Sequence, residues 1–222
     1  ALIVSFSEKK MQKKTPLLLL VAFLLTSSVP AAEDVVKATR KIEPFALNQV
    51  RLTPSPFKTA QEKDCAYLLS VNPDSLLANF RSFAGLEPKA KHYDGWESAT
   101  IAGHSLGHYL AAVSSAYAST GNEKFKEISD YIVAELAACQ EAADMGLVTA
   151  VPAFSTVFDE ISRGDIRTQG FDLNGLWVPL YTLHKIMNGL MDAYHHCDNQ
   201  AALEVAMKLG DYLIEKTKDL TD

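Results

Sequence analysis

The residues best suited to chemistry gather in one stretch, Asp94–Leu110, which holds a tryptophan, two carboxylates, two histidines and three glycines in seventeen residues. Glu97, His104 and His108 are spaced by seven and four. On an α-helix this spacing would align them on one stripe. Polar side chains on a face that would otherwise be apolar need either a polar cleft or a buried hydrogen-bond network.

Three interpretations of this stretch remain open. His104 and His108 have the i, i+4 spacing of zinc ligands, with Glu97 or His184 as a third ligand, but the glutamate of an HExxH motif is absent. They could instead be core histidines satisfied by backbone and carboxylate groups. The third interpretation is a concave surface for a hydroxyl-rich ligand, because imidazole both donates and accepts and the Trp96 indole provides an apolar plate.

A second segment, Leu176–Lys185, carries similar residues around Trp177. Its proline suits the first turn of a helix. Tyr181, His184 and Lys185 would then face one region at the start of that helix. An aromatic packing edge is the alternative, but a second such segment at an equivalent position in the chain favours a site.

The elements that must position these residues are helices. The spacing of apolar residues and the positions of Pro, Gly and Asn, which start or end helices, predict a set of helices. These cover residues 58–71, 73–84, 98–120, 122–139, 154–161, 178–194 and 201–216. We expect residues 170–174 to be a loop and residues 145–152 to be extended.

Two of the predicted helical hairpins superpose at an offset of 77 residues, so that Leu110 matches Met187 and Tyr117 matches Tyr194. Repeated hairpins without appreciable strands predict an array of hairpins, either a toroid or a solenoid. In such an array the starts of the first helices lie on one rim. Both motif-rich segments would therefore contribute to one surface.

The composition narrows the function classes. A chain of 222 residues with 48% hydrophobic and 22% charged side chains is typical of a globular protein. Its formal charge is −6 and no basic cluster lies in the body of the chain, which argues against nucleic acid or an anionic membrane as partner.

Several other polar residues do not form a recognisable catalytic arrangement. Cys65, Cys139 and Cys197 are widely spaced and are expected to be core or free thiols. We expect His195, His196 and Cys197 to end a helix, and we expect three further carboxylates to be solvated. These are Asp159, Glu160 and Asp172.

The N-terminus has the pattern of a secretory signal peptide. Two lysines precede a short apolar run from Leu17 to Leu25, and small residues typical of a signal-peptide cleavage site follow it. The apolar run is too short to span a membrane. We predict a signal peptide at 11–31, an upstream non-native segment at 1–10, and one domain at 32–222. Removing residues 1–31 leaves 17 basic and 26 acidic side chains, or −9. The expected location is periplasmic or secreted.

Three longer motifs carry a resemblance to known proteins. These are Tyr93–Ser98, Gly103–Leu110 and Val178–Ile186, and the earlier segments Tyr67–Asp74 and Asn79–Arg81 fit the same pattern. They resemble the β-L-arabinofuranosidase-like glycoside hydrolases of families 127 and 146. The resemblance extends from about Val50 to the end of the sequence.

The resemblance implies an all-α fold in which helical hairpins form part of an (α/α)6 toroid or barrel, truncated here and usually followed by β-sandwich domains. The resemblance further implies a retaining hydrolase, which removes terminal β-L-arabinofuranose from plant-type glycans. The proposed nucleophile is a cysteine beside a zinc ion held by further cysteines and a glutamate, and a second glutamate acts as acid/base. A zinc-bound cysteine is deprotonated and therefore nucleophilic at neutral pH.

The catalytic cysteines and glutamates of that pattern lie beyond Asp222, so we expect no catalytic residue and no bound metal in this chain. By the resemblance, His104, His108 and His184 line the sugar cleft. Glu97, Trp96, Trp177 and Tyr181 are expected beside them. The expected partner is an arabinose-containing glycan, with no nucleic acid and no membrane span after signal removal.

Two alternatives from other classes remain. One is a non-catalytic helical-array protein that binds carbohydrate. The other is a zinc-dependent hydrolase that uses Glu97, His104 and His108.

Overall fold

The computed structural model describes residues 42–220. The predicted signal peptide and the segment before it lie outside these residues, as does the start of the predicted domain. Phe45–Asp222 forms one compact unit, which is described by itself.

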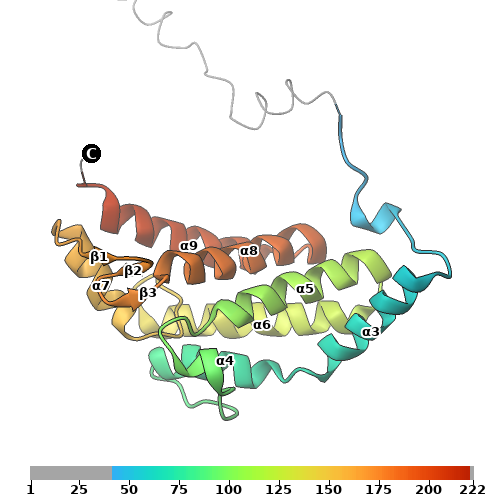
Figure 1. Ribbon diagram of the computed structural model, residues 1–222, viewed down its shortest axis with the longest axis horizontal. Coiled ribbons are helices and arrows are strands. Elements are labelled where there is room, and N and C mark those ends of the chain that lie inside the picture. Colours follow the sequence, from blue (N-terminus) through green and yellow to red (C-terminus); the bar gives the residue numbers. More distant parts are fainter. Residues whose placement is uncertain (1–41, 221–222) are drawn as a thin grey trace, which may run out of the picture. The chain divides into compact units, whose positions relative to one another are not determined.

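Helices account for most of this unit (Figure 1). In chain order the helices and strands are η1 (Leu47–Gln49), α3 (Pro56–Ser70), α4 (Pro73–Phe83), η2 (Gly95–Ser98), α5 (His104–Thr120), α6 (Glu123–Ala143), α7 (Ala153–Ser162), β1 (Thr168–Gln169), β2 (Asp172–Leu173), β3 (Leu176–Trp177), α8 (Pro179–Cys197) and α9 (Gln200–Thr217). The predicted all-α architecture of helical hairpins is confirmed.

The helix starts follow directly from local sequence. Ser55, Asn72, Asn122 and Asn199 are the N-caps of α3, α4, α6 and α9, and each side chain accepts a hydrogen bond from a backbone N–H of the first turn. Pro179 occupies the first turn of α8, where its missing N–H costs nothing. These starts lie within three residues of those predicted.

α5 and α8, the first helices of the two hairpins, lie side by side and run parallel. Their contacts advance together along both chains: the rings of His104 and Tyr181 are 6.1 Å apart, and further along Gly107 lies against the backbone of Lys185. The offset of 77 residues between the two hairpins is thus close to the register of this contact. In Figure 1, α5 lies between α8 and α6.

Two glycines allow this close approach. A Cβ on Gly107 would be 2.3 Å from the Lys185 carbonyl, and one on Gly189 would be 2.6 Å from the Gly107 oxygen. The helix backbones therefore touch directly, which fixes the rotation of α8 relative to α5.

The core lies between these helices and is apolar. Its largest fully buried side chains are Phe80, Phe125, Phe154, Phe158, Leu77, Leu106, Leu110, Ile132, Leu136, Leu147, Ile186 and Leu190. Burying such side chains is the main driving force for folding.

Two predictions about the site region are wrong. The helix expected from residue 98 begins only at His104, because Gly103 takes a left-handed φ of 95° and interrupts it. Glu97 consequently belongs to η2 rather than to a helical stripe shared with the histidines.

The second error concerns residues 168–177. The loop expected at 170–174 is part of a three-stranded antiparallel sheet, β1-β2-β3, whose strands have two residues each. Strands this short carry almost no periodic signal. Residues 145–152, expected to be extended, contain no strand.

Candidate functional site

The start of α5 is held by a buried carboxylate. Glu97 is 5% exposed, and its Oε2 accepts a hydrogen bond from the Gly103 N–H at 2.9 Å. The Asn79 side-chain amide donates to the Glu97 carbonyl oxygen at 2.7 Å and fixes the η2 backbone. The carboxylate therefore reaches the start of α5 from outside the helix, across the turn that Gly103 makes.

His104 has a defined tautomer in its neutral form. Its Nδ1 lies 2.8 Å from the carbonyl oxygen of Ile101, which can only accept, so Nδ1 carries the proton. The Nε2 atom of the neutral ring is then a hydrogen-bond acceptor. The ring is buried and lies 5.4 Å from the Trp96 indole, centroid to centroid.

The second oxygen of Glu97 has no hydrogen-bond partner. Oε1 is buried and lies 3.9 Å from His104 Nδ1, whose proton points to Ile101. Leaving a buried charged acceptor unpaired is expensive, so such an atom calls for an explanation.

α8 contributes the other side of the site. The Tyr181 hydroxyl lies 3.1 Å from His108 Nε2, and the Lys185 ammonium lies 5.0 Å above the centre of the Tyr181 ring. The backbone N–H of Trp177 donates to the Thr100 hydroxyl at 3.2 Å. The two motif-rich segments, far apart in sequence, are therefore in direct contact.

The surroundings of His108 favour its neutral form. Partial burial lowers the pKa of His108 below its usual value of 6.5, and the positive charge of Lys185 lowers this pKa further. Smaller contributions come from His104 and His184. A neutral imidazole can both donate to and accept from a hydroxyl group.

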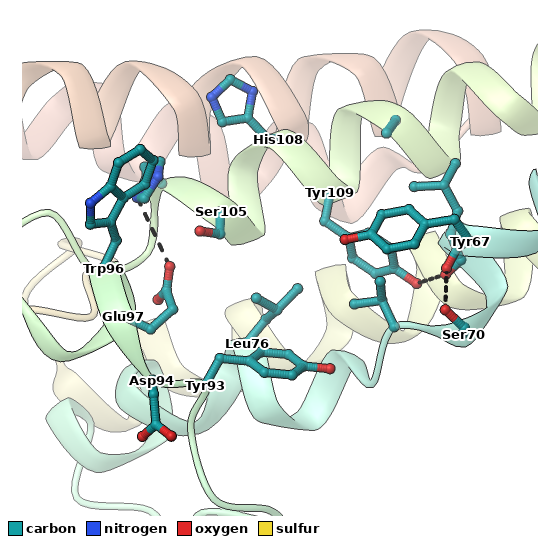
Figure 2. Close-up of a pocket in the computed structure, with 14 residues that line it drawn as sticks. Tyr67, Ser70, Leu76, Tyr93, Asp94, Trp96, Glu97, Ser105, His108 and Tyr109 are labelled. Carbon is teal, nitrogen blue, oxygen red and sulfur yellow. Dashed lines mark hydrogen bonds and ion pairs between the residues drawn. The ribbon is translucent and has the colours of Figure 1, made fainter. Parts of the chain in front are cut away.

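A cavity of about 610 Å³ opens beside the N-terminus of α5 (Figure 2). Its lining comprises Tyr67, Leu68, Ser70, Val71, Leu76, Tyr93, Asp94, Trp96, Glu97, His104, Ser105, His108, Tyr109 and Ala112. Figure 2 shows Ser105 and His108 on the helix between Trp96 on one side and Tyr67 on the other. Both the volume and the mixture of aromatic and polar groups are typical of small-molecule sites.

Four of the predicted site residues line this cavity: Trp96, Glu97, His104 and His108. Tyr181 is outside the lining but is held at its edge by His108. Trp177 lies on the adjoining strand β3, and His184 is exposed on α8.

The sequence interpretation missed three tyrosines of the cavity. The Tyr109 hydroxyl donates to the Leu68 carbonyl at 2.8 Å, and burial raises the pKa of Tyr109 to about 12. The Tyr93 hydroxyl accepts from the Asn72 N–H at 3.0 Å. Tyr109 and Tyr93, with Tyr67, lay inside the quoted motifs, but only the pairing of α3 and α4 with α5 brings them to one cavity.

Among residues 42–220, no group of three or more His, Cys, Asp or Glu side chains is placed to hold a metal ion. Cys65, Cys139 and Cys197 are free thiols, as predicted, and none of them lines the cavity. Burial raises the pKa of Cys139 to about 11, which keeps this thiol protonated at neutral pH.

Comparison with known proteins identifies one family. The family model described as β-L-arabinofuranosidase, GH127 catalytic domain, matches residues 49–222. No curated protein matches the chain. None of the helices among residues 42–220 is long and apolar enough to cross a membrane.

Proposed function

Because the chain belongs to the GH127 β-L-arabinofuranosidase catalytic-domain family of glycoside hydrolases, we propose that its cavity binds the terminal sugar of an arabinose-containing glycan. The sugar is β-L-arabinofuranose or a close relative. The chain supplies the sugar-cleft residues of an exported enzyme that removes this sugar from plant-type glycans. The signal-peptide pattern at 11–31 supports export.

The observation that carries the proposal is the lining of the cavity, which brings Trp96, Glu97, His104 and His108 together with three tyrosines. Hydrogen-bonding groups beside aromatic faces are what a sugar ring requires, because its hydroxyls donate and accept while its C–H face is apolar. The Glu97 Oε1 atom is itself buried, so this carboxylate supports the lining by holding the start of α5.

The neighbouring groups suit the remainder of a sugar ring. His104 Nε2 offers an acceptor, and neutral His108 with the Tyr181 hydroxyl offers both donors and acceptors. Trp96 is 63% exposed at the cavity and provides an apolar plate for the C–H face of the ring. His184, on the next exposed turn of α8, contacts the remainder of the glycan in this proposal.

The nucleophile and the zinc site of the family are assigned to residues outside this chain. A zinc ion would supply a deprotonated cysteine at neutral pH. The cysteines among residues 42–220 do not fit that role, because they lie apart from the cavity and are not grouped. We therefore expect this chain to bind sugar without hydrolysing a chromogenic β-L-arabinofuranoside.

The test is a titration of the chain with methyl β-L-arabinofuranoside, in which isothermal titration calorimetry measures the binding. We expect saturable binding, weakened about three- to tenfold in His104→Ala and in Trp96→Ala, as expected for one lost hydrogen bond or aromatic contact. Trp96 is exposed, so its removal does not endanger folding. His195→Ala, at the far end of α8, is the matched control and should bind as the unmodified chain does.

The proposal fails if the chain binds no arabinofuranoside, or if both cavity variants bind as tightly as the control. Turnover of a chromogenic substrate by this chain would contradict the assignment of the nucleophile to residues outside it.

A further inference from the structure

The three-stranded sheet presents one row of side chains outward. In its register Gln169 is opposite Asp172, and Asp172 is opposite Trp177. All three are exposed, whereas the pair Leu173 and Leu176 is partly or fully buried. Because side chains alternate between the faces of a strand, Gln169, Asp172 and Trp177 form a continuous outward row, called here the sheet row.

The sheet is held more firmly than an exposed loop would need. Asn174 takes a positive φ of 50°, and its side chain accepts from the Arg167 N–H and donates to Glu160 Oε2 and the Asp165 carbonyl. Arg167 forms ion pairs with Glu160 and Asp165. These contacts fix the β2–β3 turn to the end of α7.

The exit from the sheet carries backbone strain. Val178, a β-branched residue, has a φ of 45° and caps α8 in the left-handed region. Its N–H donates to the Phe171 carbonyl at 3.2 Å, which secures this conformation. Strain of this kind persists where the surrounding structure over-determines it, commonly near functional groups. Here it turns the chain between Trp177 at the end of β3 and the first turn of α8, which holds Tyr181.

The sheet row is tied to the segment that leads into α5, and the helix that follows the row contacts a residue of the cavity. Trp177 is tied by its N–H to Thr100, three residues before the N-cap of α5, and Tyr181 in the first turn of α8 touches His108. The row thus begins at Trp177, four residues before Tyr181, and extends through Asp172 to Gln169.

From this arrangement we propose that the sheet row is a second saccharide subsite, which binds the sugar unit next to the one in the cavity. The indole of Trp177 stacks on the apolar face of that sugar, and Asp172 and Gln169 bind its hydroxyls. The subsite rests on the proposed function, because it takes the remainder of a glycan whose terminal unit is in the cavity.

The composition of the row selects a neutral, hydroxyl-rich ligand. Among residues 42–220 no ion pair includes Asp172, so its carboxylate is available to a hydroxyl donor. The same carboxylate repels phosphate and therefore nucleic acid. One indole flanked by a carboxylate and an amide is also far less apolar than the core of a protein interface.

Two ligands distinguish the subsite from the cavity: methyl β-L-arabinofuranoside and a β-L-arabinofuranosyl disaccharide. Calorimetric titrations of the whole chain give both affinities. We expect Trp177→Ala to weaken disaccharide binding about three- to tenfold and to change monosaccharide binding less than twofold. Trp177→Phe should restore most of the disaccharide affinity, and Gln169→Ala, a change at an exposed position, should weaken only the disaccharide.

Phe171→Ser is the matched control, since Phe171 is an exposed aromatic in the same sheet but lies in the turn outside the row. Thermal unfolding of each variant verifies its fold. If both ligands bind the unmodified chain and the Trp177 and Gln169 variants bind the disaccharide unchanged, the subsite is refuted while the cavity proposal stands. Equal loss for both ligands likewise refutes a separate subsite, and binding of neither ligand refutes both proposals.

Discussion

The contact between α5 and α8 makes a sharp prediction about Gly107. In Gly107→Ala the added Cβ would lie 2.3 Å from the carbonyl carbon and oxygen of Lys185 and 2.6 Å from the Ile186 nitrogen. Cβ contacts below 3.0 Å are essentially never found, so the helices must separate by at least 0.7 Å. Every obstructing atom is backbone, and no side chain can rotate out of the way.

The magnitude follows from two opposing effects. Overpacking of a close-packed core costs about 1–3 kcal/mol, and a backbone clash belongs at the upper end of that range. Alanine regains up to about 1 kcal/mol through its better helix propensity. We therefore expect Gly107→Ala to lower the free energy of unfolding by about 2 kcal/mol.

Gly210 provides the matched control. It lies within α9, and a Cβ there would meet nothing within 4 Å. Gly210→Ala should therefore raise stability by roughly 0.5–1 kcal/mol, so the two variants should differ by about 3 kcal/mol. For a unit of this size that corresponds to about 6–12 °C in midpoint.

The assay is thermal and urea unfolding of the full chain, followed by helical circular dichroism. The separation should also break the hydrogen bond between His108 and Tyr181, which calorimetric sugar binding would detect. Equal stability of Gly107→Ala and Gly210→Ala would refute the direct contact of the two helix backbones.

Two further predictions concern polar groups of the cavity. Glu97→Ala should lower the free energy of unfolding by about 1–3 kcal/mol because the Gly103 N–H loses its acceptor, whereas Glu97→Gln keeps an acceptor and should cost less; equal unfolding midpoints for the two would contradict this role. His108 should titrate below pH 6.5 in NMR spectra, and Lys185→Gln should raise its midpoint, since a neighbouring positive charge is removed. Because the folded state disfavours the charged imidazole, protonation of His108 as the pH falls below 6.5 should reduce stability; an unchanged midpoint in the Lys185 variant would contradict the coupling.

Local sequence was enough to predict most of the helices and the fold class. Capping asparagines such as Asn122 and Asn199, the proline at 179, and apolar spacing act over a few residues, so their effects can be recognised without the tertiary structure. The long motifs around His104 and Tyr181 were likewise sufficient to suggest the family that the family comparison identifies.

Only the tertiary structure decided how the site is assembled. Glu97 was assigned to a helical stripe by its spacing, yet it reaches the start of α5 from outside, because the left-handed Gly103 delays the start of that helix to His104. Tyr67 and Tyr93 line the cavity because elements that are distant in the sequence pack against one another. The sheet row depends on strand register, which two-residue strands do not encode in any periodic pattern. Spacing describes neighbours along one element, whereas the cavity is formed by contacts between elements, and these depend on how the backbones of α5 and α8 meet.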